Sequence, residues 1–231
     1  MRLTIFGANG PTGRLVVRQA LALGHTVRAV TRHPDAFPAT GSGVEVVEAD
    51  VFDAAAVDRA VAGSDAVISS LGVPYSLHPI KVYSVGTGHV VTAMRHRGLR
   101  RLLCVSSTST FPVNDPQAGW LMNRVGIPLV TRTIGRTTYE DMRRMEALVR
   151  DSGLDWTIVR PSGLFTGSAV TPYRTAENFL SGRFTARADL AASLLGQVQD
   201  RCAIGKVLVV VTTQNTPSFT EWFRQEVFKQ A

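Results

Sequence analysis

The chain has few cysteines and no long apolar run, and these two absences argue against disulfide-rich and membrane-spanning classes of protein. Its 231 residues include only 2 cysteines. These two, Cys104 and Cys202, show neither metal-ligand spacing nor a disulfide framework, which suits a reducing compartment. No apolar run approaches membrane-spanning length, and the first residues enter a strand with no signal-peptide pattern. We therefore expect a soluble, cytoplasmic protein with no metal site and no membrane partner.

Lysine is also scarce, so arginine supplies nearly all of the positive charge. The net charge is +7 and the isoelectric point is about 10.1. The arginines are dispersed, and the densest basic group, residues 95–101, lies where a predicted helix ends, a place where the helix dipole favours cations. No nucleic-acid-binding motif accompanies them. We therefore expect no nucleic-acid partner, although the positive field would help to collect anionic ligands.

A glycine-rich turn stands near the start of the chain. The stretch GANGPTGR, residues 7–14, follows the apolar strand-like run RLTIF and precedes a helical pattern over residues 12–24. Glycines at Gly7, Gly10 and Gly13 allow a sharp turn that exposes backbone N–H groups at a helix start, where a pyrophosphate binds well. Taken alone, such a turn is equally compatible with a simple tight connection.

Two residues that the turn and the next strand lack decide between phosphate ligands. The nucleoside-triphosphate loop needs a lysine after its last glycine, and here Arg14 and Leu15 follow Gly13. The second predicted strand, residues 25–34, carries Arg32 near its end instead of the carboxylate that would accept from the ribose of NAD. A guanidinium there pairs with the 2′-phosphate of NADP, and Arg14 and Arg28 are near enough in sequence to assist. The alternative is that Arg32 is a solvated loop charge.

Apolar strands and helical segments alternate along the next part of the chain. Strands are predicted at residues 44–50, 65–72, 100–107 and 155–161, and helices at residues 54–63, 78–98 and 137–153. This rhythm predicts an α/β fold with a doubly wound parallel sheet and helices on both faces. The carboxyl ends of the strands then share one edge, where ligands bind in such sheets.

Five segments span nearly the whole chain: GANGPTGR, EADVFD, AVISSLG, LLCVSS and SGLDWTIVRPSGL. Together they resemble the atypical short-chain dehydrogenase/reductases, specifically the NmrA-like and biliverdin-IXβ reductase or flavin reductase-like group. The resemblance implies a Rossmann domain with a small C-terminal substrate region and NADP(H), or NAD(H), as cofactor. It implies cofactor contacts from Gly7, Asn9, Gly10, Pro11, Thr12, Gly13, Arg32, Asp50, Val51, Ser70, Leu71, Gly72, Pro161, Ser162 and Leu164.

The chain lacks the Tyr-x-x-x-Lys pair of catalytic short-chain dehydrogenases. In that pair the lysine lowers the pKa of the tyrosine so that it exchanges a proton near neutral pH. Here Arg143 follows Tyr139 at that spacing, and Met142 follows Asp141, where nearer relatives often carry a lysine or histidine. Tyr139 is still a catalytic candidate, as are Ser106 and Ser107, which follow a strand where related enzymes orient a carbonyl. Surface and capping roles are the alternatives.

Two regions outside the alternating pattern are expected to serve the substrate. The irregular segment 108–136 is predicted to cover the nicotinamide as a lid, or else to form a packing or dimer surface. Its Arg132 and Arg136 are candidates to meet an anionic substrate, and the alternative is that both are solvated charges. Residues 162–231 are predicted to form a small C-terminal substrate lobe. The whole chain, 1–231, is interpreted as a single NAD(P)-binding domain, monomeric or homodimeric.

Two functions follow from these residues. The first is an NADPH-dependent oxidoreductase that transfers hydride to a flavin, quinone or similar conjugated small molecule, since such acceptors need little acid catalysis from the protein. The hydroxyl of Tyr139 would then be dispensable. The second is a non-catalytic NADP-binding protein of the redox-sensing NmrA-like type, in which the bound nucleotide controls partner binding.

Overall fold

A central eight-stranded sheet organises the protein, in the strand order β3-β2-β1-β4-β5-β6-β10-β8. The computed structural model describes residues 1–38, 41–111, 115, 119–120, 122–133, 135–167, 169–218, 220–222 and 224. The strands are β1 (Arg2–Phe6), β2 (Thr26–Thr31), β3 (Val44–Glu48), β4 (Ala66–Ser69), β5 (Arg101–Val105), β6 (Asp155–Pro161), β8 (Tyr173–Glu177) and β10 (Lys206–Thr212). All neighbours pair in parallel except β8, which runs antiparallel to β10.

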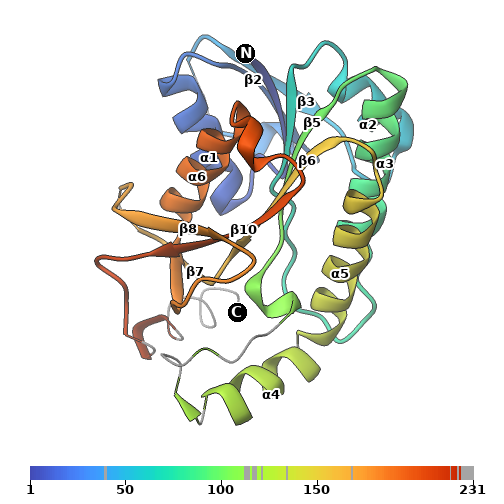
Figure 1. The fold of residues 1–231 in the computed structure, drawn as a ribbon. Coiled ribbons are helices and arrows are strands. Elements are labelled where there is room, and N and C mark those ends of the chain that lie inside the picture. The colour runs from blue at the N-terminus through green and yellow to red at the C-terminus, as the bar shows by residue number, and fades with distance from the viewer. Residues whose placement is uncertain are drawn as a thin grey trace.

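Helices cover both faces of this sheet (Figure 1). One layer holds α1 (Pro11–Ala22) and α6 (Arg187–Val198), which contact each other, and the other holds α2 (Ala54–Val61), α3 (Val82–His96) and α5 (Arg136–Arg150). Successive residues of a strand pack on opposite faces of the sheet. Leu102 packs in the cluster beneath α2, α3 and α5, and Leu103 packs in the cluster beneath α1 and α6. Strands buried on both faces in this way are typical of parallel sheets. The predicted doubly wound Rossmann-type fold is confirmed.

The predicted helix at residues 78–98 begins later than its sequence pattern indicates. The structure starts α3 at Val82, and residues 78–81 are not helical. Pro79 disfavours helix at the residue before it. The helix start is instead stabilised by a side chain from another helix, because the Asp141 carboxylate accepts hydrogen bonds from the Tyr83 and Ser84 backbone N–H groups.

The C-terminal third of the chain is divided between the main sheet and a smaller one. α6 and β10 belong to the main architecture, whereas β7 (Gly163–Phe165) and β9 (Phe184–Ala186) pair in a separate two-stranded sheet. Phe165, Phe184 and Ala186 form its small core, with Trp222 packed against them. The run KVLVVVT of β10 is β-branched and apolar, which suits an internal strand paired on both sides, between β6 and β8. The limits of the predicted substrate lobe at 162–231 stay a prediction.

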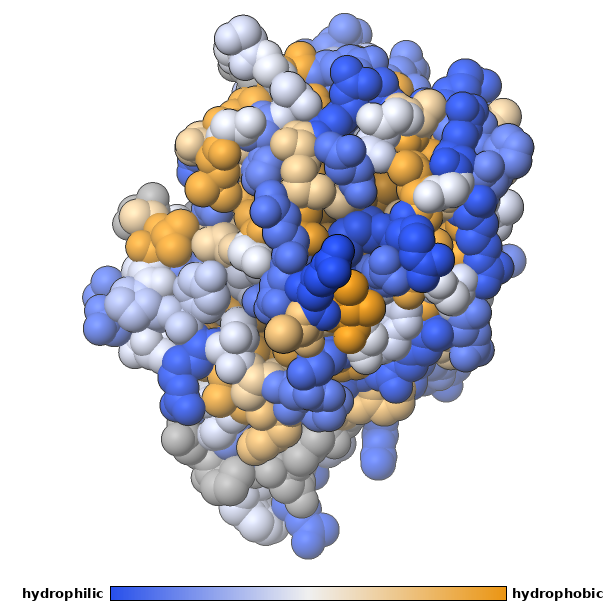
Figure 2. Space-filling view, turned by 45° about the horizontal axis from the view of Figure 1, so that its top comes forward, coloured by the Kyte–Doolittle hydropathy of each residue, from blue (hydrophilic) through white to orange (hydrophobic). Residues whose placement is uncertain are grey.

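The segment predicted to be a lid contains short helical pieces. These are η2 (Thr108–Thr110), a π-helical turn η4 (Met122–Gly126) and α4 (Ile127–Arg132), while residues 112–114, 116–118, 121 and 134 of the segment lie outside the described residues. Trp120, Val125 and Leu129 are exposed. Two further short helices are η1 (Pro34–Ala36) and η5 (Arg201–Ala203). On the face shown in Figure 2, hydrophilic residues cover most of the surface, with smaller hydrophobic areas between them.

Candidate functional site

The glycine turn after β1 is so tightly packed that two of its glycines have no room for a side chain. Gly7 has φ +72°, and a Cβ there would lie 2.6 Å from the Ser70 carbonyl oxygen. A Cβ on Gly13 would lie 2.1 Å from the Gly7 carbonyl oxygen. Gly10 is different, because its Cβ would meet only the Gly7 oxygen, at 3.3 Å. Gly7 and Gly13 therefore shape the turn, and Gly10 leaves open space above it.

This turn ends at the start of α1, and the two together fit a pyrophosphate. Gly10 is the N-cap of α1, no side chain caps that end, and Pro11 and Thr12 form its first residues. The first N–H groups of a helix lack intrahelical partners and carry positive partial charge, which suits an anion. The Gly10 N–H already donates to the Gly7 carbonyl at 3.0 Å, which holds the turn in shape without a ligand.

Arg14 ties the glycine turn to the loop after β2. Its Nε donates to the Asn9 backbone carbonyl at 2.9 Å, and its Nη2 donates to the Asn9 Oδ1 at 2.6 Å and to the Ala36 carbonyl at 3.2 Å. The guanidinium therefore bridges the two loops that flank the expected adenosine site. Its role is to fix Asn9 in place, a partner that spacing alone did not identify.

Arg32 and Arg28, which were both considered for the 2′-phosphate, lie in different surroundings. Arg32 follows the last residue of β2 at the carboxyl edge and is exposed, with no side-chain partner among the described residues. Arg28 lies earlier in the strand, where its guanidinium donates to Glu45 at 3.0 Å and to the Ala60 and Ala62 carbonyls at 2.9 and 2.7 Å. The expectation that Arg28 assists is wrong, because these partners already occupy it.

The adenine side of the predicted site lies where β3 and β4 end. Asp50 Oδ1 accepts from the Phe52 N–H at 2.9 Å, and the Val51 carbonyl lies 2.8 Å from His89 Nδ1 of α3. Val51 is buried against α3, where a Cβ on Gly86 would lie 2.9 Å from the Val51 side chain. The sequence reasoning missed His89, and only a contact between distant segments identifies it.

The connection after β4 joins the same edge. The Ser70 N–H and Oγ both donate to the Phe6 carbonyl, at 3.0 and 2.9 Å, so β4 is anchored beside the glycine turn. Leu71 is half-buried and packs against the core, and Gly72 follows it with open space around its Cα. Ser70 and Leu71 thus lie beside Gly7, and their contact with a cofactor, like that of Gly72, stays a prediction.

Pro161, Ser162 and Leu164 lie at the end of β6, where the small sheet begins. The Ser162 N–H donates to Thr185 Oγ1 and its Oγ donates to the Gly182 carbonyl, both at 3.0 Å. The Leu164 carbonyl accepts from Trp222 Nε1 at 2.8 Å. These bonds place the predicted nicotinamide-flanking residues between the main sheet and the two-stranded sheet.

The two serines that follow β5 both have partners within the protein. Ser106 is buried, and its hydroxyl donates to Glu146 Oε1 at 2.7 Å. Ser107 Oγ accepts from the Ser109 N–H at 3.1 Å and caps η2. A serine that donates its only proton to a carboxylate is not available to donate it to a substrate carbonyl.

Glu146 and Arg160 form a buried ion pair that the sequence reasoning missed. Arg160 Nε donates to Glu146 Oε1 at 2.8 Å, and its Nη2 donates to Oε2, so the pair is bidentate. Arg150 donates to the same carboxylate at 3.1 Å, and the Phe111 ring lies 4.7 Å from Arg160 Cζ. A charged residue inside the apolar strand DWTIVRP is the sequence signal that indicates such a partner.

Tyr139 is buried rather than on the surface, and its hydroxyl lies 2.7 Å from the Tyr75 hydroxyl. The residues near it in sequence are engaged elsewhere. Asp141 is fully buried and accepts from the start of α3 and from the Ser84 hydroxyl. Arg143 Nε donates to the Thr110 carbonyl at 2.6 Å. The structure therefore brings Tyr139 together with a second tyrosine, and it commits Arg143 to a backbone carbonyl.

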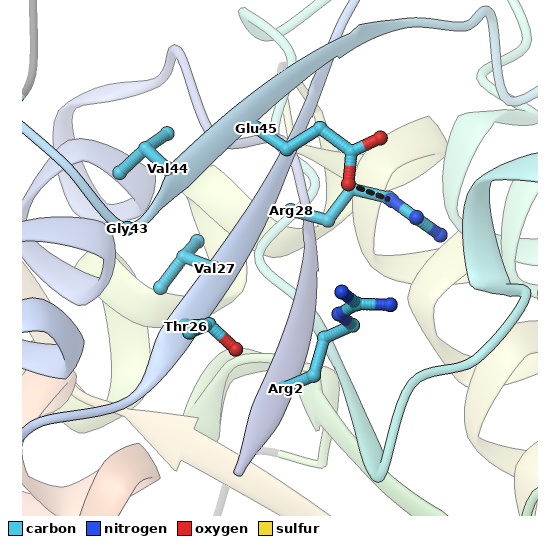
Figure 3. Close-up of a pocket in the computed structure, with 7 residues that line it drawn as sticks. All are labelled: Arg2, Thr26, Val27, Arg28, Gly43, Val44 and Glu45. Atoms are coloured by element: carbon cyan, nitrogen blue, oxygen red, sulfur yellow. Dashed lines mark hydrogen bonds and ion pairs between the residues drawn. The ribbon is translucent and has the colours of Figure 1, made fainter.

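A shallow hollow of about 250 Å³ lies at the opposite edge of the sheet, away from the residues described above. It is lined by the first residues of β1, β2 and β3 and their neighbours, including Arg2 and Arg28 (Figure 3). Glu45 already pairs with Arg28 there. Because ligands of parallel sheets bind at the carboxyl ends of the strands, this hollow is not the candidate site.

Within the described ranges, no group of three or more histidine, cysteine, aspartate or glutamate side chains is placed to hold a metal ion. No helix in these same ranges is both long and apolar enough to span a membrane.

Comparison with known proteins identifies the family. A family model described as NAD(P)H-binding matches residues 7–201. The chain belongs to this NAD(P)H-binding family. The match begins at Gly7 and includes every predicted cofactor residue, and the predicted NAD(P)-binding family with a Rossmann-type fold is confirmed.

Among relatives, the chain is 33% identical over 159 residues to (4-alkanoyl-5-oxo-2,5-dihydrofuran-3-yl)methyl phosphate reductase of Streptomyces griseus, covering 69% of this chain and 46% of that protein. Among solved structures, a short-chain dehydrogenase/reductase of Veillonella parvula in complex with NADP has a TM-score of 0.77 at 16% identity, covering 94% of this chain and 99% of the other. An anaerobilin reductase of Escherichia coli O157:H7 has a TM-score of 0.72 at 23% identity, covering 94% and 100%.

The similarity to the two solved structures, each under 25% identical, shows a shared fold. The chain spans 46% of the length of the Streptomyces reductase and 15% of the length of uncharacterized relatives from Mycobacterium, to which it is 29% identical.

Proposed function

We propose that this protein is an NADPH-dependent reductase that transfers hydride to a flavin, quinone or similar conjugated small-molecule acceptor. The family is NAD(P)H-binding, and reductases stand among the proteins it resembles. The choice of acceptor class rests on one observation. The cation that follows Tyr139 on α5, Arg143, donates to the Thr110 carbonyl, and Asp141 caps α3. The helix therefore supplies no lysine-like partner to assist proton transfer by the tyrosine.

The cofactor site is proposed at the carboxyl edge of the sheet. The glycine turn and the start of α1 would hold the pyrophosphate, with Asn9 fixed by Arg14, and Asp50 with Val51 would contact the adenine. Ser70, Leu71 and Gly72 would line the cofactor, and Pro161, Ser162 and Leu164 would flank the nicotinamide. When bound, the reduced nicotinamide supplies the hydride.

NADPH is proposed over NADH because of Arg32. The side chain is exposed at the carboxyl end of β2, and no described side chain neutralises it. A guanidinium forms bidentate, charge-assisted bonds with phosphate, which NADH lacks at the 2′ position. Arg14, whose Nη2 reaches the Ala36 carbonyl beyond Arg32, adds positive charge on the same side.

Three residues remain candidates for contact with the acceptor, and their partners distinguish them. The Ser106 hydroxyl donates to Glu146, and the Ser107 hydroxyl accepts from the Ser109 N–H. We therefore propose that both serines have a structural role beside the site. The proton that accompanies the hydride comes either from Tyr139 or from solvent. A Tyr139→Phe variant separates these routes, because loss of a general acid lowers kcat about a hundredfold or more with cofactor affinity little changed.

The test of the proposed function is NADPH oxidation with a panel of FMN, quinones and biliverdin-like acceptors. Absorbance of NADPH is followed with each acceptor, with the Gly10→Val variant, which is expected to keep the fold and to lose cofactor binding, as the control. We expect turnover with at least one conjugated acceptor and none in the control. Equal rates for both proteins would show that the oxidation does not take place at this site.

A second candidate function is a non-catalytic NADP-binding sensor. It is favoured by the partners of Ser106 and Tyr139, whose hydroxyls both bond to side chains of the protein itself. No turnover with any acceptor, together with tight binding of both NADPH and NADP⁺ by the same protein, would support this function against the reductase.

A further inference from the structure

The connection between β4 and α3 is held along its length by one helix. Residues 72–81, which we call the strap, contain no helix or strand and follow directly after the predicted cofactor contacts Ser70 and Leu71. Thr137 Oγ1 of α5 donates to the Ser76 carbonyl at 2.7 Å, and Arg144 Nη2 donates to the Ile80 carbonyl at 3.4 Å. The strap is therefore attached to α5 at two positions, Thr137 and Arg144, that lie seven residues apart along that helix.

The hydroxyl pair Tyr75–Tyr139 is a further attachment of the strap to α5. The two hydroxyl oxygens are 2.7 Å apart, and the rings are tilted by 59° with centroids 6.1 Å apart. Tyr139 is 5% exposed and Tyr75 is 49% exposed. A buried hydroxyl without a partner is costly, so this bond favours the attached strap over a detached one.

The end of the strap near Tyr83 is attached by different groups. Burial raises the pKa of the Tyr83 side chain to about 12. Asp141 holds the Tyr83 N–H at 2.9 Å. The end of the strap that joins α3 is thus fixed. At the opposite end, nothing lies within 4 Å of where a Cβ on Gly72 would be, which suits a pivot.

We propose that Tyr75 is a positioning residue of the cofactor site: its bond to Tyr139 holds the strap on α5 and thereby fixes Leu71 and Gly72 for NADPH. The inference rests on the proposed cofactor site and not on the proposed reaction. When the bond is absent, the strap spends more time detached, and part of the binding free energy is used to order it again. Tyr75 thus affects affinity without touching the reacting atoms.

The test is a double-mutant cycle read by two measurements that need no turnover. NADPH affinity is measured by the fluorescence of the bound nucleotide, and amide hydrogen exchange of residues 72–81 is measured in the free protein. A hydrogen bond between neutral groups is worth about 0.5–1.5 kcal/mol, so Tyr75→Phe is expected to raise the Kd for NADPH about two- to tenfold and to speed exchange in the strap. Tyr139→Phe is expected to do the same, and the double variant no more than either.

The matched control removes another hydroxyl pair far from the strap. Thr4 Oγ1 and Ser64 Oγ lie 2.6 Å apart in the buried region beside the amino end of β4. Ser64→Ala therefore deletes a similar bond and is expected to lower the melting temperature without changing NADPH affinity or exchange in the strap. This separates positioning from general stability.

The outcomes decide between the possibilities. Additive effects of the two tyrosine variants, or strap exchange equal to that of the wild type, would overturn the inference. A loss of kcat with unchanged Kd in Tyr139→Phe would overturn it in favour of proton donation by Tyr139. If the wild type binds NADPH but oxidises it with no acceptor, the reductase proposal fails and this inference stands. If the wild type does not bind NADPH, the cofactor site and the inference fail together.

Discussion

Removal of the Glu146 carboxylate is the strongest single perturbation that the structure suggests near the site. Glu146 is 1% exposed and Arg160 is 7% exposed, so Glu146→Gln leaves a buried guanidinium with no anion beside it. It also weakens the bonds from Ser106 and Arg150 to the same carboxylate. Breaking a buried pair by neutralising one partner costs about 3–5 kcal/mol, because the remaining charge stays desolvated.

That magnitude is a large share of the stability of a domain. The free energy of unfolding of natural domains is about 5–15 kcal/mol, and each 1 kcal/mol shifts the melting temperature of a chain of this size by about 2–4 °C. We therefore expect Glu146→Gln to lower the melting temperature by about 6–20 °C. Urea denaturation followed by circular dichroism measures the free energy directly.

The same helix offers a matched control. Glu140 forms an exposed pair with Arg136 at 3.5 Å. The substitution Glu140→Gln is chemically identical, yet exposed pairs contribute only about 0–1 kcal/mol. Equal small losses in both variants would refute the reasoning that burial makes the Glu146 pair critical. Replacing Arg160 by Met in the Glu146→Gln background should recover part of the loss, because the unpaired charge is then removed.

Three further predictions concern the cofactor site and the thiols. Arg32→Ala should lower NADPH affinity about tenfold with NADH affinity unchanged, as measured by the ratio of the two dissociation constants; an unchanged ratio would make Arg32 a bystander. Gly10→Val should abolish NADPH binding with an unchanged circular dichroism spectrum, whereas Gly13→Ala should lower the melting temperature, because its Cβ would lie 2.1 Å from the Gly7 oxygen. Burial raises the pKa of Cys104 to about 12, so a thiol reagent should modify only the exposed Cys202 in the native protein. Because the folded state holds the Cys104 thiol protonated, its contribution to the free energy of unfolding is fully present below the ordinary thiol pKa. This contribution should be lost as the pH rises from about 9 toward 12, by at most about 1.4 kcal/mol per pH unit. The Cys104→Ala variant should lack this loss.

Local patterns in the sequence were sufficient to predict the fold, and they place the proposed cofactor residues at one edge of the sheet. Strands such as RLTIF and DWTIVRP show their burial in their own composition, and the glycine spacing of residues 7–13 predicts a turn whose crowding the structure then explains. Right-handed crossovers bring the strand ends to one edge, so the topology predicts that residues far apart in sequence share one site. β10 was missed because its range had been assigned to a separate lobe.

Tertiary structure decided which partner each polar side chain takes. Arg28 and Arg32 lie on one predicted strand, yet in the folded protein Arg28 pairs with Glu45 whereas Arg32 is exposed. Tyr139 meets Tyr75 across 64 positions of the chain, and Asp141 caps a helix that begins far from it in sequence. Helix and strand periods report which face of an element is buried, but a hydroxyl, carboxylate or guanidinium has many chemically acceptable partners. Only the packing of distant segments brings one of them within hydrogen-bond distance.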